Sequence, residues 1–223
     1  MTKSILSDTQ NKFLANFGKS KLANSFYLSG GTALAEFYIP YRYSEDLDFF
    51  SENEFEVSQV LVYLKSTKKS LGYKKIDFNT SFNRNIFHLL FPKETLKLEF
   101  TYYPFPQIEK PIIRKDFMVD SSIDIATNKI FTIYQNPRSR DFIDLYMLHK
   151  KFGYSMKDLI GKAKAKFDWH VDPIKLGSQF QLVKKVKDYP RLITKVKNQD
   201  WQNFFLEEAN KLQINIFKLN PRG

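Results

Sequence analysis

The chain has 223 residues, of which 43% are hydrophobic, so it is long and apolar enough to fold around a buried core. The absence of cysteine excludes disulfides, thiol nucleophiles and cysteine-based zinc sites. Only three histidines occur, and they are scattered, so a histidine-rich metal site is not expected. No stretch reaches the ~18 apolar residues of a membrane helix, and residues 1–20 lack the apolar core of a signal peptide. The sequence therefore predicts a soluble, cytoplasmic protein with no membrane partner.

The formal net charge is +11, and the excess lies mainly in the last third of the chain. From Leu145 to Gly223 there are 16 lysines and arginines against seven aspartates and glutamates. Such a surplus indicates either a set of solvated helix faces or a surface that binds a polyanion such as the RNA or DNA backbone.

Hydrophobic periodicity in the first 120 residues predicts alternating helices and strands. The predicted helices cover 8–18, 32–37 and 56–69. The predicted strands cover 26–28, 46–50 and 74–80, followed by a hairpin over 85–91 and 95–103 and a further short strand within 112–119.

The composition changes near residue 120, after which helical patterns and lysines dominate. Helices are predicted over 122–134, 140–152, 155–167, 173–187 and 200–217. The fold class expected is α/β (α+β): a mixed β-sheet core flanked by helices over 1–120, followed by a helical region over 121–223.

A glycine pair and two aspartates form the most informative stretch. Gly30 and Gly31 lie between a short apolar strand and a helix, where free backbone N–H groups suit a phosphate. Asp46 and Asp48 alternate with apolar residues, so in a strand they share one face. Two carboxylates on one face repel each other unless a cation lies between them, and Mg²⁺ binds carboxylates together with substrate phosphates.

A third carboxylate is predicted on a neighbouring strand. Leu96, Leu98 and Phe100 alternate with polar residues, which places Glu99 on the polar face. Together with the two aspartates it would suit two-metal phosphoryl or nucleotidyl transfer. The alternative is that Glu99 pairs with Lys97 or another neighbour.

The string GGTALAEFYIPYRYSEDLDFF resembles the signature of the AbiEii/AbiGii-type nucleotidyltransferases, which belong to the DNA polymerase β-like nucleotidyltransferase superfamily. The residues that match the signature are Gly30, Gly31, Thr32, Arg42, Ser44, Asp46 and Asp48. A second block, Lys129 followed by Arg140-Asp141-Phe142-Ile143-Asp144-Leu145, resembles the later family motif. The resemblance covers about residues 25–150.

The resemblance implies a metal-dependent transfer of a nucleoside monophosphate from an NTP. Catalytic roles would fall to Asp46, Asp48 and Lys129, and the Mg²⁺ or Mn²⁺ ligands would be Asp46, Asp48 and Glu99. The NTP would be bound by Gly30, Gly31, Thr32, Ser44, Lys129 and Asp141. Many superfamily members have Gly-Ser in place of this Gly-Gly pair, so the serine's metal or phosphate contact would be either absent or supplied by Thr32.

The resemblance also implies a toxin of a toxin–antitoxin or abortive-infection system that modifies RNA, in particular tRNA, with an antitoxin as a possible partner. The basic C-terminal region would bind the RNA. Two alternatives stay open: nucleotidylation of a protein hydroxyl, and an inactive module that only binds nucleotide or RNA. For Asp141 and Asp144, which share a helix face, the alternative to a catalytic role is a salt bridge to Arg138, Arg140 or Arg42.

Overall fold

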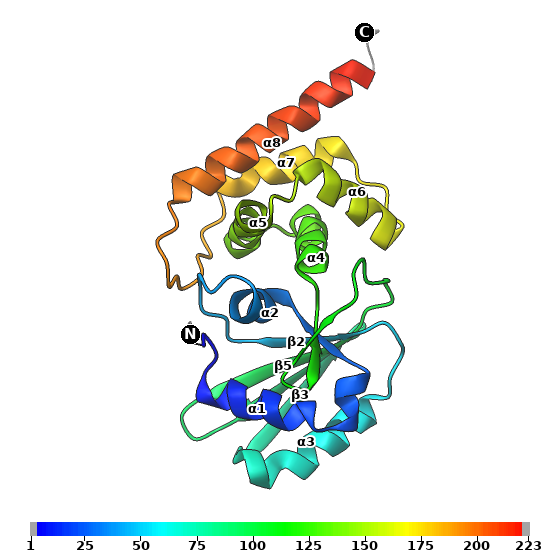
Figure 1. Ribbon diagram of the computed structural model, residues 1–223, viewed down its shortest axis with the longest axis vertical. Helices are drawn as coiled ribbons and strands as arrows, with labels where there is room; N and C mark the ends of the chain where they lie inside the picture. The colour runs from blue at the N-terminus through cyan, green and yellow to red at the C-terminus, as the bar shows by residue number, and fades with distance from the viewer. Residues whose placement is uncertain (1–3, 220–223) are drawn as a thin grey trace. The chain divides into compact units, whose positions relative to one another are not determined.

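The computed structural model describes the backbone of residues 4–219 and the side chains of 4–213. Contacts divide the chain into two compact units, Met1–Ser121 and Ser122–Gly223. Each unit is described by itself below (Figure 1). No helix in the described part of the chain combines the length and the hydropathy that a membrane span requires.

The first unit is built on a seven-stranded mixed sheet in the order β3-β4-β5-β2-β1-β7-β6. The strands are β1 Tyr27–Ser29, β2 Leu47–Ser51, β3 Lys75–Ser81, β4 Arg84–Leu90, β5 Thr95–Tyr102, β6 Ile112–Arg114 and β7 Phe117–Val119. β2 runs antiparallel to β1 and parallel to β5, and β1 runs parallel to β7. The predicted mixed α/β fold is confirmed.

One face of this sheet is covered by α1 (Asp8–Gly18) and α3 (Val57–Leu71), which lie together in Figure 1. The ring of Phe17 in α1 lies 4.4 Å from that of Phe49, and Phe49 stacks on Phe100 at 4.9 Å between ring centroids. All three rings are fully buried. Because side chains alternate along a strand, this packing turns Asp48 and Glu99 to the opposite face.

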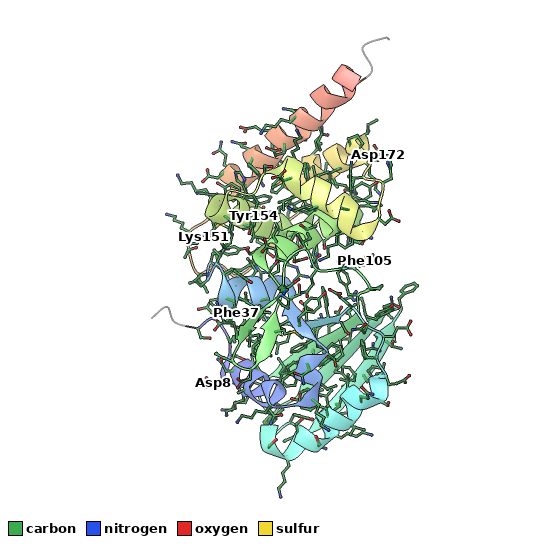
Figure 2. The ribbon with its side chains drawn as sticks, turned by 45° about the vertical axis from the view of Figure 1, so that its right-hand side comes forward. Asp8, Phe37, Phe105, Lys151, Tyr154 and Asp172 are labelled. Carbon is green, nitrogen blue, oxygen red and sulfur yellow. The ribbon has the colours of Figure 1, made fainter. Side chains whose placement is uncertain are left out.

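The short helix α2 (Gly30–Phe37) follows β1 directly and packs against β1 and β2. Its last residue, Phe37, lies edge-on to Phe117 of β7, with ring centroids 6.1 Å apart, and is labelled in Figure 2 together with Asp8 at the start of α1. The glycine pair was expected as a turn before the helix, and the helix begins at this pair, with Gly30 in the positive-φ conformation of a turn residue. The N–H groups of the pair therefore belong to the unpaired set at a helix start.

The second unit is helical: α4 Ser122–Gln135, α5 Ser139–Phe152, α6 Met156–Phe167, α7 Pro173–Gln181, a 3₁₀ turn η2 Leu182–Lys184, and α8 Asn198–Leu219. In Figure 1, α8 runs along α7, and these two helices share the unit's most extensive packing. Its core gathers large aromatic side chains on α5, α7 and α8: Phe142, Phe180, Trp201 and Phe205. Asp172 caps α7 by accepting a 2.8 Å hydrogen bond from the Ile174 amide and is labelled in Figure 2.

Two predicted elements are wrong in detail. The helix expected over 173–187 ends at Gln181, and after η2 the chain is irregular, because closely spaced like charges and Pro190 disfavour another helical turn. The single strand expected within 112–119 is a hairpin of β6 and β7. Its turn residues Lys115 and Asp116 have φ angles of 48° and 66°, a turn geometry that sequence reasoning expects at glycine or asparagine.

Candidate active site

Gly30 and Asp48 lie side by side because of the pairing of β1 with β2. Ser29 of β1 is opposite Asp48 in the register, and Gly30 follows it with a φ of +71°. A Cβ added to Gly30 would lie 2.5 Å from Asp48 Oδ2, closer than real atoms approach. Glycine is therefore required twice at this position, for its backbone conformation and for the space beside the carboxylate.

Gly31 lies against a different set of side chains. A Cβ there would lie 2.1 Å from Arg42 Nη2 and 3.2 Å from Ser44 Oγ. Arg42 is buried and donates a 3.0 Å hydrogen bond from Nη1 to the Tyr43 carbonyl. The departure from Gly-Ser thus has a physical reason, because the space of a residue-31 side chain is filled by groups from the loop before Asp46.

Asp46 directly precedes β2 and is held on three sides. Its carbonyl accepts a hydrogen bond from Thr32 Oγ1, and its carboxylate Oδ2 accepts one of 2.8 Å from Lys97 Nζ. Gln10 of α1 donates to the carbonyls of Ser44 and Glu45 at 3.1 and 3.0 Å, which fixes the loop just before the aspartate. Thr32 is fully buried, and its hydrogen bond to the Asp46 carbonyl fixes the backbone at this aspartate.

Glu99 is opposite Asp48 in the parallel register of β5 and β2. It is buried, and Arg84 of β4 binds its carboxylate with a two-pronged pair, Nε to Oε1 at 2.6 Å and Nη2 to Oε2 at 2.7 Å. The hydrogen bonds to Glu99 raise the pKa of Arg84 despite partial burial. The charges of Asp48 and Asp46 raise the pKa of Arg84 further, so all three predicted carboxylates act on one guanidinium.

The donor set of Asp46 and Asp48 suits a hard divalent cation, because both supply carboxylate oxygens and Gly30 leaves space beside Asp48. Lys97 already places a positive group on Asp46. Within the described residues, no three acidic or histidine side chains converge closely enough to hold a metal ion by themselves. Such an ion would therefore take its remaining ligands from substrate phosphates and water.

The predicted residues of the second unit form a buried charge network. Lys129 of α4 lies 2.6 Å from Asp141 Oδ1 and 2.7 Å from Asp144 Oδ2, while Arg138 binds Asp141 Oδ2 at 2.7 Å. Both aspartates are fully buried. Burial by itself would raise the pKa of Asp141, but the charges of Lys129 and Arg138 outweigh it and hold that pKa below its usual value. The network includes the Asp141–Arg138 salt bridge that the sequence left as an alternative.

The lowered pKa of Asp141 predicts an acid-sensitive contribution to stability. That contribution is complete above the unfolded-state pKa of about 3.9 and is lost as the pH falls through the lower folded-state value. Asp141→Asn should lower the free energy of unfolding by about 3 kcal/mol at pH 7, because it breaks a buried ion pair. Urea titrations at pH 7 and pH 3 should show a smaller difference from wild type at pH 3.

The control is Asp158→Asn on α6, an exposed position where about 0.5 kcal/mol or less is expected. An Asp141→Asn effect of equal size at both pH values would show that the ion pair contributes nothing to the loss.

Sequence reasoning missed Arg84 and the pairing of Lys97 with Asp46. Strand alternation placed Lys97 on the same face as Glu99, and this was the available signal for Lys97. Arg84 reaches Glu99 from the neighbouring strand, where it is opposite Thr101, and a cross-strand register cannot be read from one strand's pattern.

The chain matches, over residues 12–212, the family described as nucleotidyl transferase AbiEii toxin of type IV toxin–antitoxin systems. It is 31% identical over 153 residues to the uncharacterized protein aq_aa25 of Aquifex aeolicus (strain VF5), a match that covers 66% of this chain and 68% of that protein.

Two solved structures share the fold. One is an H. pylori protein provisionally described as a nucleotidyltransferase, with 21% identity and a TM-score of 0.61 over 96% of this chain and 99% of that one. The other is JHP933 from Helicobacter pylori, with 22% identity and a TM-score of 0.60 over 96% of this chain and 94% of that one.

Proposed function

Because the chain belongs to the AbiEii nucleotidyl transferase toxin family, we propose that it transfers a nucleoside monophosphate from an NTP to RNA, with tRNA as the foremost candidate. In this proposal it acts in the cytoplasm as the toxin of a toxin–antitoxin system, and a cognate antitoxin is its protein partner. The membership supports nucleotidyltransferase activity, and the site residues support the finer statements.

The approach of Gly30 to Asp48 is the observation that carries the proposal. A helix start with free N–H groups attracts phosphate, and here it lies against the carboxylate best placed to share a cation with that phosphate. An ordinary tight turn needs no such contact. In the proposed site, Asp46 and Asp48 hold the divalent cation, Mg²⁺ or Mn²⁺, and the glycine pair and Ser44 face the NTP phosphates.

Bound at these two aspartates, a divalent cation would neutralise phosphate charge and lower the pKa of the attacking hydroxyl. The chain's own residues set the geometry for this. Thr32 and Gln10 fix the backbone on either side of Glu45, and the register with β1 fixes Asp48. A third-ligand role for Glu99 requires Arg84 to release its carboxylate.

In this proposal Lys129 and Asp141 take part in nucleotide binding only if the salt bridges of Lys129 rearrange. The ammonium of Lys129 is shared by two aspartates, so binding a phosphate would mean exchanging one carboxylate partner for a phosphate oxygen. Asp141 would then orient Lys129 and contact the nucleotide only through it.

A basic segment supports RNA as the acceptor. Residues 184–197, between η2 and α8, contain six lysines and arginines and a single acidic residue. That residue, Asp188, accepts hydrogen bonds of 2.8 and 3.0 Å from the Ser139 amide and hydroxyl, so it anchors the segment to the start of α5. Tyr189, Leu192 and Ile193 are exposed among the positive charges, and a polyanion with stacked bases fits this combination. The last four residues of the basic region, 220–223, lie outside the described residues.

Reversing three charges in this segment should weaken RNA binding. Lys184→Glu, Lys185→Glu and Lys187→Glu together should lower RNA affinity by about tenfold or more at 0.1 M salt. They should also make the slope of log K against log salt concentration shallower by about two to three, because fewer counterions are released on binding. Fluorescence anisotropy with a labelled tRNA at several salt concentrations measures both quantities.

The matched control reverses three exposed lysines of α3, Lys65, Lys68 and Lys69, which change the net charge equally. If both triple variants lose affinity to the same extent, the segment has no specific role and only the net charge matters.

The acceptor is tested by incubating the protein with each α-labelled NTP, Mg²⁺, total RNA and total protein, with Asp48→Ala as control. Label in RNA supports the proposal. Label in protein would instead establish nucleotidylation of a protein hydroxyl. Nucleotide binding without pyrophosphate release for any NTP would establish an inactive binding module.

A further inference from the structure

Two of the predicted site carboxylates carry a basic side chain from β4 or β5. Lys97 Nζ lies 2.8 Å from Asp46 Oδ2, and Arg84 forms a salt bridge with Glu99. Lys97 reaches Asp46 because the parallel register pairs Leu98 with Leu47, so the residues one position earlier lie alongside each other. The Lys97 and Asp46 side chains keep 30% and 37% of their surface exposed, so the pair can exchange partners with solvent species.

The Lys97 ammonium lies on an oxygen that the proposed cation would use. Lys97 and a divalent cation bound to the same carboxylate repel each other, so cation binding weakens the Lys97–Asp46 contact and favours release of the lysine. A displaced lysine on a strand face beside the cation needs a new anion, and the phosphates of a bound NTP supply one.

We propose that Lys97 competes with the cation for Asp46 and thereby couples cation binding to NTP binding. Binding of the cation alone disrupts the Lys97–Asp46 ion pair without replacing it. When an NTP binds together with the cation, a contact between Lys97 and a phosphate replaces the lost ion pair. Such coupling is reciprocal: the NTP must tighten cation binding by the same factor by which the cation tightens NTP binding. This inference rests on the proposed cation site at Asp46 and Asp48.

An ordinary structural salt bridge makes the opposite prediction. If Lys97 only stabilises the sheet, its removal leaves Asp46 less well oriented, and cation affinity falls or stays the same. If Lys97 competes with the cation, its removal tightens cation binding. A partly exposed pair is worth up to about 1 kcal/mol, which corresponds to about a two- to fivefold change in affinity.

The test measures Mn²⁺ binding to the full chain by titration calorimetry and by the electron paramagnetic resonance of free Mn²⁺, with and without a non-hydrolysable NTP analogue. Lys97→Met keeps the apolar stem and removes the charge, while Lys97→Arg keeps the charge. Lys97→Gln is a second neutral variant. The matched control is Lys75→Met, which removes the charge of another lysine–aspartate pair, Lys75 to Asp77 at 2.6 Å. That pair is on β3, which is three strands away from β2 in the sheet, or about 14 Å. At this distance salt screens the effect of its charge on the proposed cation site.

Lys97→Met and Lys97→Gln should bind Mn²⁺ alone about two- to fivefold more tightly than wild type, and the NTP analogue should tighten Mn²⁺ binding less than it does in wild type. Lys97→Arg and Lys75→Met should resemble wild type. Unchanged or weaker Mn²⁺ binding by both neutral variants overturns the inference, even when wild type binds Mn²⁺ and Asp48→Asn does not. If wild type binds no Mn²⁺ at a site that Asp48→Asn removes, the proposed cation site itself is wrong.

Discussion

Asp48→Asn should lower the rate of nucleotidyl transfer by about 10³-fold or more while the protein stays folded. Cation-mediated stabilisation of transition-state charge is worth several kcal/mol, and an asparagine oxygen cannot hold the cation as a carboxylate does. The fold should persist because the core packs on the other face, through Phe49 and Phe100. Initial rates of label transfer and thermal melts of the same preparations measure the two effects.

Asp77→Asn is the control for this variant, since it removes another aspartate of the same sheet, one that forms an ion pair with Lys75 on β3. It should leave the transfer rate within about twofold of wild type. Equal transfer by Asp48→Asn and wild type would remove Asp48 from the reaction.

Gly30→Ala should have the second largest effect, a loss of about 10²-fold in transfer. The added Cβ would meet Asp48 Oδ2 at 2.5 Å, so the carboxylate must move. Misplacing a reacting group by about 1 Å is enough for a loss of this size. The left-handed backbone adds roughly 1–2 kcal/mol of strain to the folded state.

Gly72→Ala separates these two causes. Gly72 ends α3 with a φ of +85°, and a Cβ there meets nothing within 4 Å. It should therefore lose a similar amount of stability and no activity. If Gly72→Ala and Gly30→Ala lose transfer equally, instability explains the loss and the contact with Asp48 does not.

The strands and helices that build the site could be predicted because local patterns define them. The apolar residues around Asp46 and Asp48 alternate with a strand's period of two, and the structure places β2 at Leu47–Ser51, one residue later than expected. Gly72 and Gly153 end α3 and α5 with positive φ, the conformation that glycine commonly adopts after the last helical residue. The mixed sheet and the helical second unit follow from the same signals.

The partners of the charged residues could not be predicted, because they depend on register and packing. Glu99 was expected to bind a cation or to pair with Lys97 or another neighbour, and the neighbour it pairs with, Arg84, could not be named from the sequence. Lys97 turns to Asp46 because β5 runs parallel to β2, and strand direction is not encoded in either strand alone. Burial of Lys129 with two aspartates requires the packing of α4 on α5, which no single helix pattern contains.

The structure also changes the role of the glycine pair. The sequence suggested that Thr32 replaces the serine of the Gly-Ser turn, but its hydroxyl is bonded to the backbone of Asp46. Ser44 Oγ and the Arg42 guanidinium lie where a side chain at position 31 would be. Both come from the loop that Gln10 fixes, so the first helix contributes to the proposed phosphate site from a distance in sequence.

The most direct test of nucleotidyl transfer compares the same NTP labelled on its α-phosphate and on its γ-phosphate, incubated with the protein, Mg²⁺ and total tRNA. Nucleotidyl transfer attaches the α-phosphate to the acceptor and releases the other two as pyrophosphate. We expect label in tRNA from the α-labelled NTP and none from the γ-labelled one, and we expect no label in tRNA from either NTP for Asp48→Asn. Label in tRNA from the γ-phosphate, or α-label that persists in Asp48→Asn, would contradict it.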